Sequence, residues 1–114
     1  MYKFKKLFKT IKIGEMELKN RIAFGEQAPQ AAHGFITQAT EDFYVERARG
    51  GAGLVMVGGV CPDISSLGTE SMARIDDDIY IPAFAKMAKR MREAAPDVKI
   101  GIQLLDFLST LFTD

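Results

Sequence analysis

The first clear pattern along the chain is an alternation of apolar and polar side chains over residues 11–18. It runs on both sides of Gly14 and Glu15, as in two antiparallel strands joined by a two-residue turn. Gly14 suits the first central position of a type II′ turn, where φ is positive. A short apolar run at residues 22–24, which ends at Gly25, predicts a buried strand after this hairpin.

Residues 25–38 show no clear period and predict a long loop, a kind of segment that is often functional in compact domains. A helix is expected from about Thr40, with Thr37 or Thr40 as its cap. Acidic residues lie in its first turn and basic residues in its last turn, which is the charge order that suits the helix dipole. Gly50 and Gly51 then end this helix.

The clearest strand covers residues 53–58, a continuous apolar run bounded by glycines. Such a run is typical of a strand that is buried on both faces of a parallel sheet. Apolar residues then recur at helical spacing over residues 84–95, which predicts an amphipathic helix that begins near Pro82 and ends before Pro96. Residues 98–104 predict a third strand.

Strands that alternate with helices of this length indicate βαβ units, a parallel sheet and therefore an α/β fold. Ligands of such sheets bind beyond the carboxyl ends of the strands. The segments expected there are residues 25–32, residues 58–68 and the residues after Gln103. Glu26 and Gln27 follow the first of these strands, so they can converge with Gln103 on one ligand, and a glutamine amide offers both donors and an acceptor.

Composition narrows the classes of function. The chain has 114 residues, with 15 Lys and Arg against 15 Asp and Glu, so the net charge is zero. This balance gives no electrostatic case for binding to nucleic acid or to an anionic membrane. The longest apolar stretch, residues 54–60, is too short to span a bilayer, and no signal peptide is evident, so a cytoplasmic location is expected.

Four features have a structural explanation that is favoured over a chemical one. The glycines at residues 50–53 precede a strand, whereas a dinucleotide-binding glycine motif follows one, so they predict a helix stop. His33, the only histidine, is expected at the surface, and Cys61, the only cysteine, is expected to be a small half-buried side chain. The acidic run at residues 76–78 is expected to be solvated charge at a helix start. No catalytic residue and no metal site is assigned.

Three segments together resemble a known enzyme family. Residues 7–22, residues 43–54 and the stretch from the acidic run at 76–78 through the following helix to Gln103 and Leu104 resemble the old yellow enzyme family, the NADH:flavin oxidoreductases. The resemblance is closer to the branch of trimethylamine dehydrogenase and the 2-enoate and 2,4-dienoyl-CoA reductases. It implies a (β/α)₈ barrel, the TIM barrel, which carries FMN at its carboxyl face and needs about 250 residues.

On this resemblance the chain is one incomplete domain, the amino-terminal portion of such a barrel with about three βα units. Residues 1–20 would be the hairpin that closes the opposite end of the barrel, and residues 21–104 the βαβαβ core. Residues 105–114 form a tail that departs from the family pattern. The family's His-Gly-Arg elements and its later substrate and phosphate sites have no counterpart in this sequence.

The resemblance also implies which residues contact the cofactor. The flavin-contacting segment after the first strand corresponds to Gly25, Glu26, Gln27 and Ala28. Most members have proline where this chain has Glu26. The small residue near the flavin corresponds to Gly59, and the glutamine that bonds the pyrimidine edge of the flavin corresponds to Gln103.

The implied activity of a complete enzyme is NAD(P)H-dependent reduction of an activated alkene, a small-molecule substrate, through the N5 atom of FMN. The alternative is a non-catalytic remnant, left by truncation or a frameshift, with weak or no flavin binding. In that alternative the open sheet edges would favour self-association. A complete small α/β binding module of another class is a third interpretation.

Overall fold

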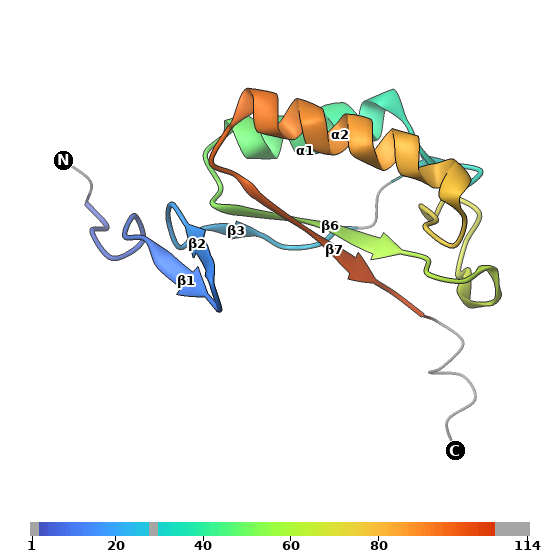
Figure 1. The fold of residues 1–114 in the computed structure, drawn as a ribbon, viewed down its shortest axis with the longest axis horizontal. Helices are drawn as coiled ribbons and strands as arrows, with labels where there is room; N and C mark the ends of the chain where they lie inside the picture. The colour runs from blue at the N-terminus through green and yellow to red at the C-terminus, as the bar shows by residue number, and fades with distance from the viewer. Residues whose placement is uncertain (1–2, 28–29, 107–114) are drawn as a thin grey trace, which may run out of the picture.

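A computed structural model describes residues 3–27 and 30–106 of the chain. Its centre is a parallel sheet with the strand order β3–β6–β7, formed by β3 (Ala23–Phe24), β6 (Leu54–Val60) and β7 (Lys99–Leu104). The helices α1 (Gln38–Arg49) and α2 (Ile81–Ala94) lie side by side over one face of this sheet (Figure 1). The predicted alternation of strands and helices is therefore confirmed.

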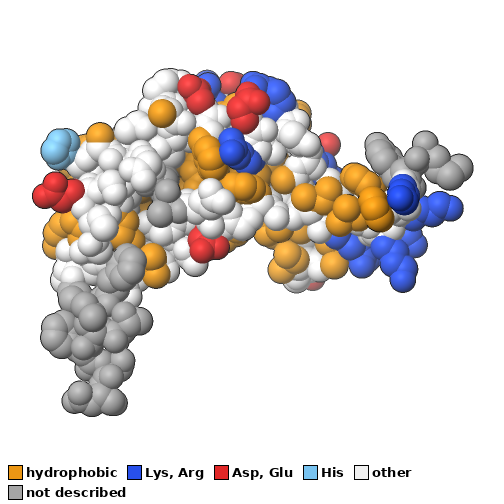
Figure 2. Space-filling model, turned by 180° about the vertical axis from the view of Figure 1, so that it is seen from behind, with side chains coloured by type: hydrophobic (Ala, Val, Ile, Leu, Met, Phe, Trp, Pro, Cys, Tyr) orange, Lys and Arg blue, Asp and Glu red, His pale blue; other side chains and the backbone are white. Residues whose placement is uncertain are grey.

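The amino-terminal hairpin consists of β1 (Ile11–Ile13) and β2 (Met16–Leu18), which pair antiparallel as the alternating pattern predicts. Ile13 pairs with Met16, so the loop has two residues, and Gly14 adopts the positive φ of 59° that the turn requires. The hairpin lies at the end of the sheet where the parallel strands begin (Figure 1). The lysines of the amino-terminal region gather at this end of the molecule (Figure 2).

Helix α1 begins two residues earlier than expected. Its cap is Thr37, whose side chain accepts a hydrogen bond from the Thr40 amide at 3.2 Å. The helix ends at Gly50, and Gly51 then takes a φ of 105°, which confirms the predicted glycine stop. Its buried face includes Tyr44, Val45 and Ala48.

The core lies between the helices and the sheet. Val55, Val57 and Val60 of β6 are fully buried, and α2 packs Phe84, Met87 and Met91 toward them. The two helices are also joined by an ion pair between Glu41, which is buried, and Arg90 at 2.7 Å. The prediction that this strand is buried on both faces is confirmed only in part, because the alternate residues Leu54 and Met56 are half-buried. The helical spacing of the apolar residues in α2 is explained by contact with the sheet.

The predicted burial of residues 22–24 is wrong. Ala23 is exposed and Phe24 is half-buried, because β3 is a two-residue strand with a partner on one side only, the β6 side. Its apolar residues gain their cover from α1, where the Phe24 ring packs edge to face against Phe43 and Tyr44.

The unbroken loop expected over residues 25–38 is also wrong in part. A small antiparallel hairpin, β4 (Ala31–Ala32) and β5 (Phe35–Ile36), lies within it. Its turn consists of His33 with a φ of 51° and Gly34 with a φ of 87°. Positive φ at both central residues is the geometry of a type I′ turn, but histidine is a less familiar signal there than asparagine or aspartate.

Two short 3₁₀ turns complete the described elements. Ile64–Ser66 lies in the loop after β6, and Asp78–Tyr80 leads directly into α2. Within residues 3–27 and 30–106, no helix combines the length and the apolar character that crossing a bilayer requires.

Candidate functional site

The carboxyl ends of β3, β6 and β7 lie at one edge of the sheet, as expected of parallel strands. Gly25, Glu26 and Gln27 follow β3 and are exposed, whereas Gly59 at the end of β6 is buried and Gln103 near the end of β7 is half-buried. Ala28, the fourth residue of the predicted segment, lies outside the described residues. Residues 107–114 of the predicted tail also lie outside them.

The strongest contact at this edge joins Gly59 to Gln103. The Gly59 amide donates to the Oε1 atom of Gln103 at 3.1 Å. Two residues that are 44 positions apart in the sequence, and that were both predicted for the site, therefore touch each other.

A β-bulge creates this contact. Val57 pairs with Ile102 and Val60 pairs with Leu104, so two residues of β6 stand opposite one residue of β7. Gly59 accommodates the bulge with a φ of 68°, a conformation that a side chain would strain. Bulges of this kind re-aim side chains and are frequent beside active sites.

The side-chain amide of Gln103 is only half used by the protein. Its Oε1 atom accepts from Gly59, while its Nε2 group donates to no partner within the part of the chain that the structure describes. Two N–H donors therefore remain for carbonyl-like acceptors of a ligand at this edge.

Glu26 lies directly against Gly58. A Cβ atom built on Gly58 would be 2.0 Å from the Cβ atom of Glu26 and 2.3 Å from its Cγ atom. Glycine at this position thus lets the segment after β3 lie flat on the end of β6. At Gly25, by contrast, an added Cβ would meet nothing within 4 Å, so packing does not require glycine there.

The hydroxyl of Tyr44, a residue of α1, connects the segment after β3 to the end of β6. It donates to the carbonyl oxygen of Gln27 at 2.7 Å and accepts from the amide of Gly58 at 3.4 Å. Burial raises the pKa of Tyr44 above its ordinary 10.0, and the charge of Glu26 adds to this rise, so the hydroxyl keeps its proton at neutral pH.

Tyr44 was not among the residues predicted for the site, and Gly58 was expected there only as the first residue of the segment 58–68, without a contact of its own. The signal available for Tyr44 was its chemistry, because a tyrosine on a buried helix face needs a partner for its hydroxyl. For Gly58 there was no local signal, since its neighbour Glu26 lies 32 residues earlier in the sequence.

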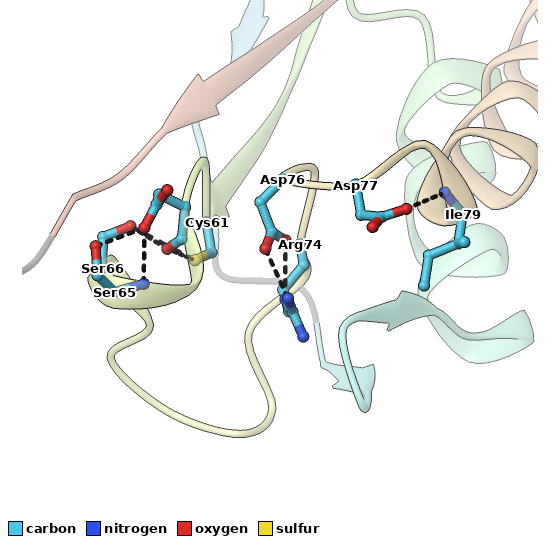
Figure 3. Close-up of polar contacts among 8 residues, drawn as sticks. Cys61, Ser65, Ser66, Arg74, Asp76, Asp77 and Ile79 are labelled. Carbon is cyan, nitrogen blue, oxygen red and sulfur yellow. Dashed lines mark hydrogen bonds and ion pairs between the residues drawn. The ribbon is translucent and has the colours of Figure 1, made fainter.

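The loop after β6 is held by its own polar contacts (Figure 3). Cys61 was expected to be half-buried but is fully buried, because the returning chain covers it, and its thiol donates to the carbonyl oxygen of Asp63 at 2.8 Å. The Cys61 backbone bonds to Ala73 and Ile75, so the chain returns beside the end of β6. Hydrogen bonds from Ser65 hold the pKa of Asp63 below its ordinary value.

Charged residues farther along this loop also have structural roles. Asp76 accepts two hydrogen bonds from the Arg74 guanidinium, at 2.8 and 2.6 Å, and this pairing lowers the pKa of Asp76. Asp77 caps the turn before α2 by accepting from the Ile79 amide (Figure 3). The prediction of solvated charge at a helix start is therefore confirmed for Asp77 and Asp78, which are exposed, and is wrong for Asp76, whose side chain is 11% exposed and paired with Arg74.

His33 does not join the residues at the strand ends. It is exposed at the tip of the β4–β5 hairpin. Among the described residues, no group of three or more His, Cys, Asp or Glu side chains is arranged to hold a metal ion.

Comparison with known proteins gives concordant results. The sequence matches the model of the NADH:flavin oxidoreductase / NADH oxidase family over residues 6–113. It is 35% identical over 92 residues to an NADH oxidase of Thermoanaerobacter brockii, covering 78% of this chain and 14% of that protein. It is 34% identical over 103 residues to an NADPH dehydrogenase of Bacillus subtilis (strain 168), covering 88% of this chain and 30% of that protein.

Among solved structures, Old Yellow Enzyme from Pichia sp. AKU4542 superposes with a TM-score of 0.79 at 24% sequence identity. The superposition covers 89% of this chain and 26% of that one. The chain thus spans less than a third of the length of each of these three proteins.

Proposed function

Because the chain belongs to the NADH:flavin oxidoreductase / NADH oxidase family, we propose that it binds the isoalloxazine ring of FMN at the carboxyl edge of its sheet. The predicted family and the predicted fold class, a portion of an α/β barrel, are confirmed by the family match and by the superposition. The contact between Gly59 and Gln103 carries the proposal, because it leaves two amide donors at the same edge of the sheet as the segment that follows β3.

The residues present suit the ring of FMN better than its phosphate. The pyrimidine part of the ring presents carbonyl oxygens, which match the free Nε2 donors of Gln103. The Gly59 amide would hold the Gln103 side chain in place, and residues 25–27 would line one side of the ring. A phosphate carries negative charge and favours cationic donors, but residues 25–27, 58–61 and 103–106 include Glu26 and Asp106 and no Lys or Arg.

The proposed reaction is that of a complete enzyme of the old yellow enzyme type. When bound, FMN supplies the redox ring through which NAD(P)H reduces an activated alkene. The contribution of this chain is to orient that ring, with Gln103 on its pyrimidine edge and residues 25–27 beside it. Relatives named for NADH and for NADPH support a nicotinamide reductant.

A direct titration tests the binding step. Purified chain is added to FMN and to riboflavin, and quenching of flavin fluorescence is recorded. Since the proposed contacts are to the ring, both flavins should bind, with dissociation constants within about three-fold of each other. Binding of FMN alone would contradict a ring-centred site, and binding of neither flavin would favour the non-catalytic alternative.

One observation favours that alternative, in which the isolated chain binds flavin weakly and associates with itself. Strands β3 and β7 are both edges of the described sheet. On β7 the side chains of Ile102 and Leu104 are 38% and 59% exposed. Open edges with apolar side chains favour pairing between chains. Sedimentation of the purified chain over a range of concentrations tests this, and a monomer throughout would reject it.

We further propose a cytoplasmic location and a small-molecule substrate, with no nucleic acid or membrane as partner. The balance of 15 basic and 15 acidic residues supports this proposal, since it provides no overall positive charge for polyanions.

A further inference from the structure

We propose that Tyr44 is a positioning residue for the flavin site: its hydroxyl fixes the segment after β3 against the end of β6. This proposal rests on the proposed FMN site but concerns a residue that does not itself reach the ligand edge. The Tyr44 bridge, as we call it, consists of the hydroxyl, the Gln27 carbonyl and the Gly58 amide.

The bridge joins the segment after β3 to the end of β6. Residues 25–27 are exposed, and Gln27 accepts a hydrogen bond from the buried Tyr44 hydroxyl at 2.7 Å. The Gly58 amide lies in the bulged part of β6, where regular pairing with β7 is interrupted. This amide donates to the Tyr44 hydroxyl at 3.4 Å, which gives a buried N–H group a partner.

The tyrosine ring is well placed to hold that hydroxyl still. Tyr44 is 0% exposed, and its ring packs edge to face against Phe43 at 5.2 Å and against Phe24 at 6.4 Å between centroids. It stands near the middle of the 12-residue helix α1, which itself packs on β6. Because packing holds the ring in place on this helix, the hydroxyl fixes the position of residues 25–27 relative to the sheet.

Further contacts connect the bridge to the carboxyl edge of the sheet, where the flavin is proposed to bind. Gly58 is followed by Gly59, whose amide holds the Gln103 side chain. On the other side, Glu26 lies on Gly58 at the position that a Cβ would occupy. Loss of the Tyr44 hydroxyl should therefore loosen both residues 25–27 and the contact between Gly59 and Gln103. The phenyl ring of residue 44 should keep its place in the core.

The test compares Tyr44→Phe with Tyr80→Phe. Tyr80 is a matched control, because it is also buried, at 3% exposed, but its ring packs against Phe35 and Arg74 and takes no part in the Tyr44 bridge. Flavin affinity is measured by fluorescence quenching, and amide hydrogen exchange is measured without flavin at Gly58 and at Val55. Replacement of Tyr44 by 4-aminophenylalanine restores a donor and serves as the rescue.

We expect Tyr44→Phe to weaken flavin binding about ten-fold, with exchange accelerated at Gly58 and not at Val55. Tyr80→Phe should change neither, and the amino variant should recover most of the affinity. Affinity of Tyr44→Phe equal to wild type, or no recovery with the amino variant, would overturn the proposal, since a tyrosine that only fills the core would be indifferent to the donor.

Hydrogen exchange separates this proposal from the proposed function. If the wild-type chain binds no flavin, the proposed function fails for this chain, and exchange alone decides on the bridge. Selective acceleration at Gly58 in Tyr44→Phe would then support the bridge as a positioning device. Unchanged exchange at Gly58 would overturn it.

Discussion

The two ends of β6 are built alike but differ in one respect that bears on function. At each end a glycine lies against a side chain from the segment around β3: Gly53 against Asn20 and Gly58 against Glu26. A side-chain amide also stands at each end, Asn20 at the amino end and Gln103 at the carboxyl end.

The two amides differ in what they leave free. Asn20 is buried and uses both of its groups, donating to the Gly51 carbonyl at 2.8 Å and accepting from the Ile22 amide at 3.1 Å. Gln103 uses its oxygen only, within the described residues. A satisfied amide stabilises a fold, whereas an amide with free donors at a strand end is suited to a ligand. We therefore expect changes at the amino end to affect folding and changes at the carboxyl end to affect binding.

The largest effect is expected for Asn20→Ala. The substitution leaves the Gly51 carbonyl and the Ile22 amide without their partner, which should lower the free energy of unfolding by about 2–3 kcal/mol. Urea denaturation followed by circular dichroism measures this. The control is Gln38→Ala, which removes an exposed side-chain contact to Asp42 and should cost under about 0.5 kcal/mol. Equal losses in the two variants would mean that Asn20 does not fix the amino end.

A matched pair of glycine substitutions tests whether the two ends of β6 differ in their effects on stability and on FMN binding. Gly53→Ala would place a Cβ 2.7 Å from the Oδ1 atom of Asn20, and Gly58→Ala would place one 2.0 Å from the Cβ of Glu26. We expect Gly53→Ala to cost about 2 kcal/mol of stability, because its neighbours are buried. Gly58→Ala would displace the backbone of Glu26 as well, since the Cα atom of Glu26 would be 2.7 Å from the new Cβ. Because residues 25–27 are exposed, we expect this segment to shift as a whole, which should cost less stability than Gly53→Ala and should weaken FMN binding.

These two variants are to be compared by urea denaturation and by FMN titration in parallel. The opposite result, in which Gly58→Ala is the less stable variant and Gly53→Ala binds FMN more weakly, would contradict the expectation. It would mean that the amino end of β6 does not mainly affect folding and that its carboxyl end does not mainly affect binding.

A smaller loss of stability is expected when the pH is lowered. The Arg74 guanidinium holds the pKa of Asp76 below its ordinary 3.8, so the pair contributes stability that is fully present above that value. This contribution is lost as the pH falls below 3.8 through the lower pKa of the folded protein. Hydrogen exchange near pH 3 should therefore accelerate at residues 73–75, beside the carboxyl end, more than at residues 51–54, where neutral groups make the contacts.

Asp76→Asn provides the control for this pH dependence. The variant keeps the shape of the side chain but cannot ionise, so its exchange at residues 73–75 should already be fast at neutral pH and should change little on acidification. The same acid response in wild type and Asp76→Asn would show that another group is responsible.

The elements that a local pattern encodes were predictable from the sequence. The hairpin around Gly14, the two helices and strand β6 follow from alternation, helical spacing and glycine stops, all of which act over a few residues. The position of Glu26, Gln27 and Gln103 at one edge of the sheet also followed, because parallel strands end at the same edge. Their convergence on one ligand stays a prediction.

What the sequence did not reveal depends on contacts between distant residues. The bulge at Gly59 is set by the register of β6 against β7, and the clearance at Gly58 by the path of the segment after β3. The hydroxyl of Tyr44 could be placed only once α1 was docked on β6. The turn at His33 and Gly34 was missed for a different reason, since each of its strands has two residues and shows no period.

The most direct test of the central claim is an FMN titration of wild type against Gln103→Leu, with stability measured alongside. Leucine keeps the approximate volume but removes both the bond to Gly59 and the free donors. We expect FMN affinity to fall at least about ten-fold while the free energy of unfolding changes by under about 1.5 kcal/mol. Wild-type affinity in Gln103→Leu would contradict it.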